Sequence, residues 1–200
     1  RLSVFFFVLG GLTSYFDFLT TPQLTLGFPL ITLMLTRTER RTSKSVVGLS
    51  VLWAAGYSLI WAGKWLVARL ITPQSIMQSV VGAAEMRVSD TIVYGREEML
   101  MSEFFSLIWE KICGMVGAVP VYGGIVMLVM LVALGVVMAY RYRAALRPHA
   151  WLILIVLIVP VWYVVMKNHT LQHIFFTWRA IAVTVWSLSL LVMNVWHGRK

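Results

Sequence analysis

Five residues of this sequence have side chains that could do chemistry and that are uncommon in apolar surroundings: Asp17, Lys64, His169, His173 and Arg179. Each lies within or next to a long apolar run. A charged group in hydrocarbon is costly, so ionisable residues at such positions are functional candidates by default. The set offers a carboxylate for proton transfer, two cations for an anionic group, and two histidines at the spacing of one helix face.

Lys64 stands in the segment Trp61-Ala-Gly-Lys64-Trp65. It lies about seven residues, hence roughly 10 Å, from the outer end of its apolar run. An ammonium at that depth would suit a phosphate. The alternative is that its long stem reaches the lipid headgroups between the two tryptophans.

Asp17 and the segment 167–179 complete the set. Asp17 lies at the outer end of the first apolar run, where it could act as a general base, pair with Lys64, or simply end a helix. His169 and His173 could ligate a metal, which would need further ligands that the sequence does not identify, or could lie at the interface without chemistry. With Arg179 they could instead form a rim that binds phosphate or sugar. Asn168-His-Thr170 also matches the N-glycosylation sequon.

Composition places these residues in a membrane. Hydrophobic residues make up 60% of the 200 residues and charged residues 12%, and the mean hydropathy is +0.82. These values exclude an ordinary soluble domain. The net charge of +9 comes from short basic tracts between apolar runs. This pattern is typical of the tracts that set membrane orientation and does not indicate a nucleic-acid partner. The single cysteine, Cys113, excludes an internal disulfide.

The elements that must position the candidates are apolar helices. A spanning helix needs about 20 apolar residues. Four runs meet or approach that length: Val46 to Ile71, Val119 to Tyr140, Trp151 to Met166 and Phe175 to Val195. The runs Leu2 to Phe18 and Leu24 to Thr36, the second containing Pro29, form either two further spans or a re-entrant hairpin. We therefore predict an all-α, polytopic transmembrane bundle with about six spans.

Basic residues predict the orientation. Most of the 17 Lys and Arg residues lie on one side of these spans, in Arg1 and the segments 37–44, 141–147 and 199–200. Both termini are therefore predicted to be cytoplasmic, in a multi-pass protein of the cell membrane. Trp162 is expected in the aromatic belt at the outer interface. With this topology all five candidates fall near the outer face.

The connection 72–118 faces outward and is too long for a turn. Its apolar spacing predicts two amphipathic helices that lie at the interface, separated by a break over 89–95. The first begins at Thr72-Pro73 and presents Ile76, Val80 and Ala84. The second begins near Glu97 or Ser102 and presents Phe104, Leu107, Ile108 and Ile112. No internal repeat divides the chain, so residues 1–200 are expected to form one domain, and the apolar start directly after Arg1 suggests a fragment of a longer chain.

Three stretches carry a resemblance: residues 15–27, Trp61-Ala-Gly-Lys64-Trp65, and the segment from Asn168 to Arg179. They resemble the C-terminal part of large bacterial polytopic proteins whose general build is similar to GT-C-type glycosyltransferases. The resemblance implies transfer of a sugar from a polyprenyl-phosphate carrier at the outer face. Lys64 and Arg179 would then hold the phosphate, the histidines would bind sugar or acceptor, Asp17 would be the base, and the outward helices would roof the site. The family normally carries its catalytic carboxylate in an early outward loop. If that loop lies upstream of Arg1, the resemblance does not carry the catalytic role over to Asp17.

Two other functions fit the same pattern. A transporter or channel component would use Pro29 and Pro160 to break its spans. A non-catalytic membrane scaffold would use the outward helices to bind another protein. The bilayer is the one partner that all three functions share.

Overall fold

The computed structural model describes residues 1–16, 21–72, 76–88, 100–116 and 143–197. Every regular element within these ranges is helical, as the composition predicts. The first half contains α1 (Leu2–Tyr15), α2 (Pro22–Thr36), η2 (Thr38–Arg40), α3 (Ser43–Ile71), α4 (Ile76–Val88) and α5 (Met101–Val116). The second half contains α7 (Arg143–Leu146), η3 (Arg147–His149), α8 (Ala150–Val165), α9 (Lys167–Gln172), α10 (Ile174–Thr177), η4 (Trp178–Ala180) and α11 (Ile181–His197).

Three helical stretches in the described part are long and apolar enough to cross a membrane: Ser43–Ile71, Arg147–Val165 and Ile174–Val195. They match three of the four predicted runs. The fourth, Val119 to Tyr140, lies outside the described residues. With 14 and 15 residues, α1 and α2 reach only about 21 to 23 Å at the helical rise, less than the hydrocarbon thickness of about 30 Å. The structure therefore fits a membrane protein, while six spans and the re-entrant hairpin stay predictions.

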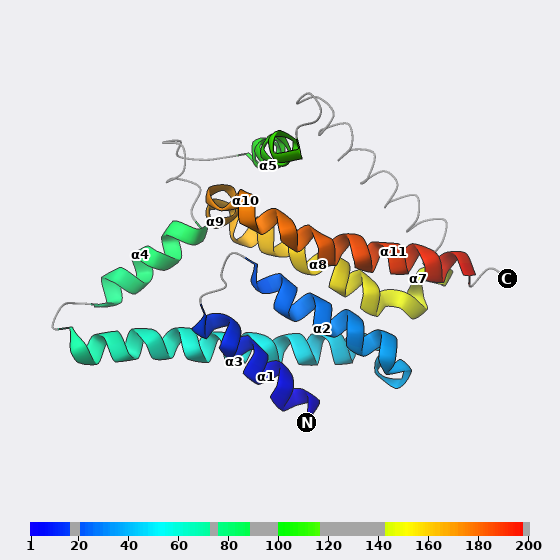
Figure 1. Ribbon diagram of the computed structural model, residues 1–200, viewed down its shortest axis with the longest axis horizontal. Coiled ribbons are helices and arrows are strands. Elements are labelled where there is room, and N and C mark those ends of the chain that lie inside the picture. The colour runs from blue at the N-terminus through cyan, green and yellow to red at the C-terminus, as the bar shows by residue number, and fades with distance from the viewer. Residues whose placement is uncertain (17–20, 73–75, 89–99, 117–142, 198–200) are drawn as a thin grey trace.

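The helices form an elongated bundle (Figure 1). α8 and α11 run side by side in opposite directions, and α2 lies between this pair and α3. The core is built from side chains without exposed surface, among them Leu30 and Ile31 of α2, Leu152 and Ile155 of α8, and Val183 of α11. The end of α2, the start of α3, α7 and the end of α11 gather at one end of the bundle, which we call the basic end. α4, α9 and α10 lie toward the other end.

The closest packing in the described part is the crossing of α1 over α3. A Cβ atom on Gly10 would overlap the carbonyl oxygen of Trp53, and one on Gly56 would overlap the carbonyl oxygen of Phe7. Only glycine allows the two backbones to approach this closely, which is how membrane helices commonly associate. Gly11 lies at the same crossing, where a Cβ added to it would be 3.3 Å from Cγ1 of Ile60. These close contacts therefore fix the position of α3 along α1.

The two helices predicted in the connection 72–118 are present as α4 and α5, while their outward placement stays a prediction. On α5, Phe104 and Ile108 are buried and Leu107 is half-buried, which confirms the predicted apolar face at these positions. On α4, Val80 is half-buried but Ala84 is exposed. The predicted break over 89–95 lies outside the described residues.

The α1–α3 crossing makes the first testable prediction. Gly10→Ala places a methyl group against the backbone of Trp53 and should lower the stability of the detergent-solubilised protein by about 1–3 kcal/mol, the usual cost of overpacking. Gly63→Ala is the matched control on α3, because no heavy atom lies within 4 Å of its added Cβ. Thermal unfolding of both variants measures the difference. Equal midpoints for the two variants would contradict the crossing.

Candidate functional site

The chain breaks its helical path twice between α8 and α11. Met166 has φ −107° and ψ 46°, and His173 has φ −113° and ψ 25°, both outside helical geometry. Between and after these breaks, α9 has six residues and α10 has four. We call residues 167–177 the polar turn, because it buries three consecutive polar side chains: Asn168, His169 and Thr170 are 1%, 7% and 0% exposed.

Contacts from three helices hold the polar turn. The hydroxyl of Tyr163, on α8, donates to the carbonyl oxygen of Thr177 at 2.6 Å. The ammonium of Lys111, on α5, donates to the carbonyl oxygen of Leu171 at 3.2 Å. α5 also packs on α9 and α10, and α4 packs on α9. α4 and α5 therefore cover this turn.

The two histidines lie together. Their ring centroids are 4.7 Å apart with the planes tilted by 49°, as the i, i+4 spacing predicts. Within the described residues no group of three or more His, Cys, Asp or Glu could hold a metal, and a histidine pair alone falls short of the ligands of a zinc site. The burial of Asn168 and Thr170 argues against the sequon, since glycosylation acceptors lie on the surface.

The two candidate cations have separate partners. The ammonium of Lys64 donates to the carbonyl oxygen of Ser14 at 2.6 Å. Ser14 is in the last turn of α1, where carbonyls lack helical partners and the helix dipole favours a cation. Arg179 is exposed, with its guanidinium carbon 5.6 Å from the centroid of the Phe176 ring, a cation–π distance. Asp17 lies outside the described residues. A phosphate site made from Lys64 and Arg179 stays a prediction.

A feature that the sequence analysis missed lies beside the polar turn. A pocket of about 340 Å³ opens between α3, α4 and α8. We call it the aromatic pocket, because its walls include Trp53, Tyr57, Trp61 and Trp162. The rings of Trp53 and Tyr57 stack, with centroids 5.4 Å apart and planes 25° apart. The three aromatic residues of α3 follow each other at four-residue spacing, so they share one helix face.

The aromatic pocket has one cationic side chain in its lining, Arg87 of α4. One guanidinium nitrogen of Arg87 donates to the carbonyl oxygen of Ala83 at 2.6 Å. A guanidinium has five N–H donors, so others remain for an anion. The buried indole N–H groups of Trp53 and Trp162 have no acceptor among the described residues. Met166 also lines the pocket and directly precedes the polar turn, so the two features are adjacent along the chain.

This arrangement suits an amphipathic molecule. Indole and phenol rings offer large apolar faces, and an arginine at the pocket offers charge-assisted hydrogen bonds to phosphate or carboxylate. The four-residue spacing of Trp53, Tyr57 and Trp61 is visible in the sequence. Arg87 and Trp162, which close the pocket, lie far along the chain and could be added only by the fold.

No family model matches this chain, and no curated protein or solved structure shows significant similarity to it.

The hydrogen bond from Lys64 to Ser14 gives a test of whether Lys64 stabilises the helix packing or binds phosphate. Lys64→Met removes a charge-assisted hydrogen bond and should lower the stability by about 1 kcal/mol, with faster amide exchange in the last turn of α1. Arg69→Met is the matched control, because it removes a cation from the exposed surface of the same helix. Unfolding midpoints and hydrogen exchange measure both effects. Unchanged stability together with lost phosphate binding in Lys64→Met would instead support Lys64 as a phosphate ligand.

Proposed function

We propose that this chain is an integral membrane protein that binds a lipid-linked substrate in the aromatic pocket. More specifically, we propose that it is the C-terminal portion of a glycosyltransferase that uses a polyprenyl-phosphate sugar at the outer membrane face. The observation that carries the proposal is the aromatic pocket itself, which joins apolar aromatic walls to Arg87 and borders a buried polar turn. Such a substrate likewise combines an apolar chain, an anionic phosphate and a polar sugar.

The apolar part of the substrate would contact the tryptophans. The volume of about 340 Å³ is within the range of small-molecule sites, which is about 300–1,000 Å³. Only the phosphate-proximal part of a polyprenyl chain would fit. The remainder would lie in the bilayer along the exposed apolar side chains of α3, such as Leu59, Leu66 and Leu70.

The anionic part would contact Arg87. A guanidinium binds phosphate oxygens through parallel hydrogen bonds, and these strengthen as charge develops on a leaving phosphate. The polar turn follows Met166 directly. Its amide, imidazole and hydroxyl groups at Asn168, His169 and Thr170 are of the kind that bind sugars, but these side chains are buried beside the pocket and do not line it. The proposed chemistry still needs a carboxylate base, for which Asp17 remains the sequence's candidate.

The proposal predicts which residues bind the carrier. Trp61→Ala and Arg87→Gln should each weaken the binding of purified protein to a short-chain polyprenyl phosphate by about tenfold, which corresponds to about 1.4 kcal/mol. Trp186→Ala and Arg69→Gln are matched controls, because Trp186 on α11 and Arg69 on α3 are exposed and lie outside the pocket lining. Native mass spectrometry of lipid-bound protein measures the affinities.

Two outcomes would contradict the proposal. One is undetectable binding of polyprenyl phosphate to the wild-type protein, which would favour a scaffold function. The other is equal loss of binding in the pocket variants and in their controls, which would indicate adsorption to the apolar surface. Circular dichroism of each variant checks that its helices are retained.

A further inference from the structure

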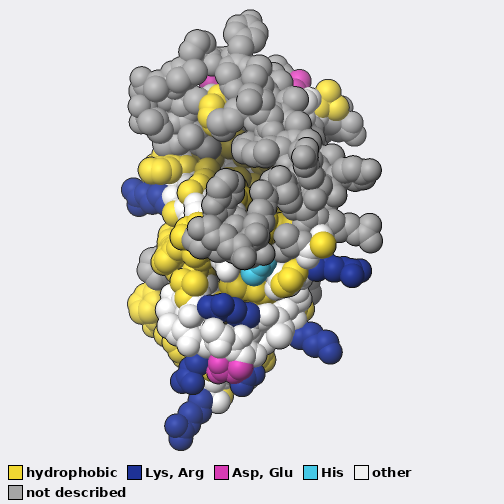
Figure 2. Space-filling view, turned by 90° about the vertical axis from the view of Figure 1, so that its right-hand side faces the viewer, with side chains coloured by type: hydrophobic (Ala, Val, Ile, Leu, Met, Phe, Trp, Pro, Cys, Tyr) yellow, Lys and Arg dark blue, Asp and Glu magenta, His cyan; other side chains and the backbone are white. Residues whose placement is uncertain are grey.

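A second pocket opens at the basic end, away from the proposed substrate site. It lies between the beginnings of α1 and α3 and next to η2, and its volume is about 550 Å³. We call it the basic pocket. Three of its lining side chains are cations, Arg1, Arg40 and Lys44, and no acidic residue is among the described residues that line it. Figure 2 shows Lys and Arg side chains projecting from this end of the molecule.

The lining of the basic pocket changes from charged to apolar. Ser3 and Ser45 add two hydroxyl groups, and Leu2, Leu49 and Leu52 add apolar surface. Lys44, Ser45, Leu49 and Leu52 lie within the first turns of α3, and positions 45, 49 and 52 share one helix face. Moving along α3 from its first residue into the bundle, the lining passes from an ammonium through a hydroxyl to two leucines. This is the polarity profile of a phospholipid from headgroup to acyl chain.

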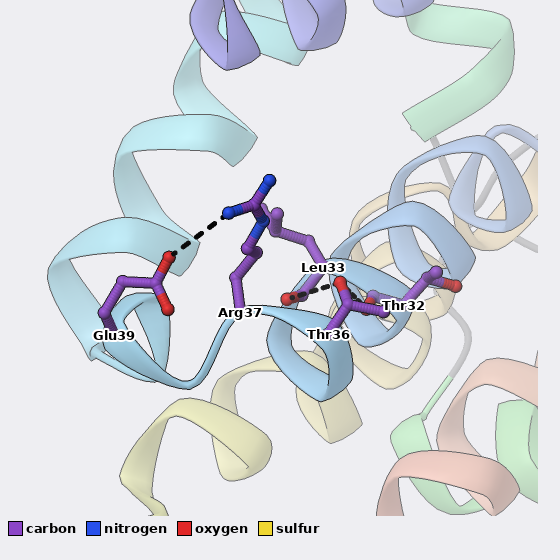
Figure 3. A network of polar contacts seen from close by, with 5 residues as sticks. All are labelled: Thr32, Leu33, Thr36, Arg37 and Glu39. Atoms are coloured by element: carbon purple, nitrogen blue, oxygen red, sulfur yellow. Dashed lines mark hydrogen bonds and ion pairs between the residues drawn. The ribbon is translucent and has the colours of Figure 1, made fainter.

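Neighbouring cations outside the pocket have partners of their own. Arg37 forms an ion pair with Glu39 at 4.0 Å (Figure 3). In the helix turn before Arg37, the hydroxyl of Thr36 donates to the carbonyl oxygen of Thr32 at 2.9 Å. The guanidinium of Arg41 donates to the carbonyl oxygen of Met34 at 2.7 Å, at the end of α2. Arg40 and Lys44 differ from both, because neither side chain has an ion pair or a hydrogen bond within the described part of the chain.

Gly48 keeps the basic pocket open. It lines the pocket, and no heavy atom lies within 4 Å of a Cβ added to it. A side chain at this position would therefore occupy the pocket without disturbing the packing of α1 on α3. Gly48 thus differs from Gly10 and Gly56, where an added Cβ meets backbone.

We propose that the basic pocket binds the phosphate group of an anionic phospholipid, with Arg40 and Lys44 as its ligands and an acyl chain along Leu49 and Leu52. Guanidinium and ammonium groups on phosphate oxygens form charge-assisted hydrogen bonds, and the positive end of the α3 dipole adds to the attraction. Basic pockets between membrane helices on the predicted cytoplasmic side suit such headgroups. From the sequence, these basic residues predict only the membrane orientation. The pocket adds a proposed phosphate ligand for Arg40 and Lys44.

The test compares charge and shape. Purified full chain is titrated with phosphatidylglycerol, and bound lipid is counted by native mass spectrometry. The double variant Arg40→Gln/Lys44→Gln should lose affinity at least tenfold, and Gly48→Leu should lose it to a similar extent without any change of charge. Arg37→Gln and Gly63→Leu are the matched controls, with less than a twofold change expected, because Arg37 is outside the pocket and Gly63 has open space elsewhere on α3.

Two further titrations show whether the phosphate belongs to a lipid headgroup or is free inorganic phosphate. Phosphatidylcholine should bind at least tenfold more weakly than phosphatidylglycerol, because its headgroup has no net charge. Inorganic phosphate should compete only weakly, because it cannot use the two leucines. Inorganic phosphate that binds as tightly as the lipid would overturn the lipid as ligand. Equal affinities of wild type, Gly48→Leu and the double variant would overturn the pocket as a site.

Discussion

The glycine crossing of α1 over α3 is the contact on which the rest of the structure depends. At Gly10 and Gly56 the two backbones meet without side chains between them, which fixes the rotation of α3 about its own axis. The face of α3 that carries Gly56 and Lys64 lies toward α1. The adjoining face is thereby turned to α4 and α8, and it carries the aromatic side chains Trp53, Tyr57 and Trp61. Both pockets depend on this crossing, because the basic pocket lies between the first turns of the same two helices.

Much of the helical architecture could be predicted from the sequence. Apolar runs of sufficient length indicated three spans within a few residues of their observed bounds, because a helix satisfies its own backbone hydrogen bonds in hydrocarbon. The spacing of Phe104 and Ile108 predicted α5 and its buried face for a similarly local reason. Both are properties of a single segment, which periodicity reports directly.

The sites were harder to predict because they join distant segments. The pairing of His169 with His173 follows from local spacing and is observed. The partner of Lys64 is the carbonyl oxygen of Ser14, fifty positions earlier, and no pattern in the sequence identifies that carbonyl. The aromatic pocket needs residues of α4 and α8 to meet α3, and the basic pocket needs Lys44 to meet the start of α1. Contacts between such distant segments are determined by helix packing, which local sequence patterns do not report.

The measurement that tests the central proposal most directly is photo-crosslinking with a polyprenyl phosphate that carries a photoreactive group next to its phosphate. The cross-linked peptides are then mapped by mass spectrometry. Binding in the aromatic pocket predicts labels on residues 53–61 of α3 and 84–87 of α4, reduced by excess unlabelled carrier. Labels spread over the exposed apolar surface, or unaffected by that competitor, would contradict the proposal.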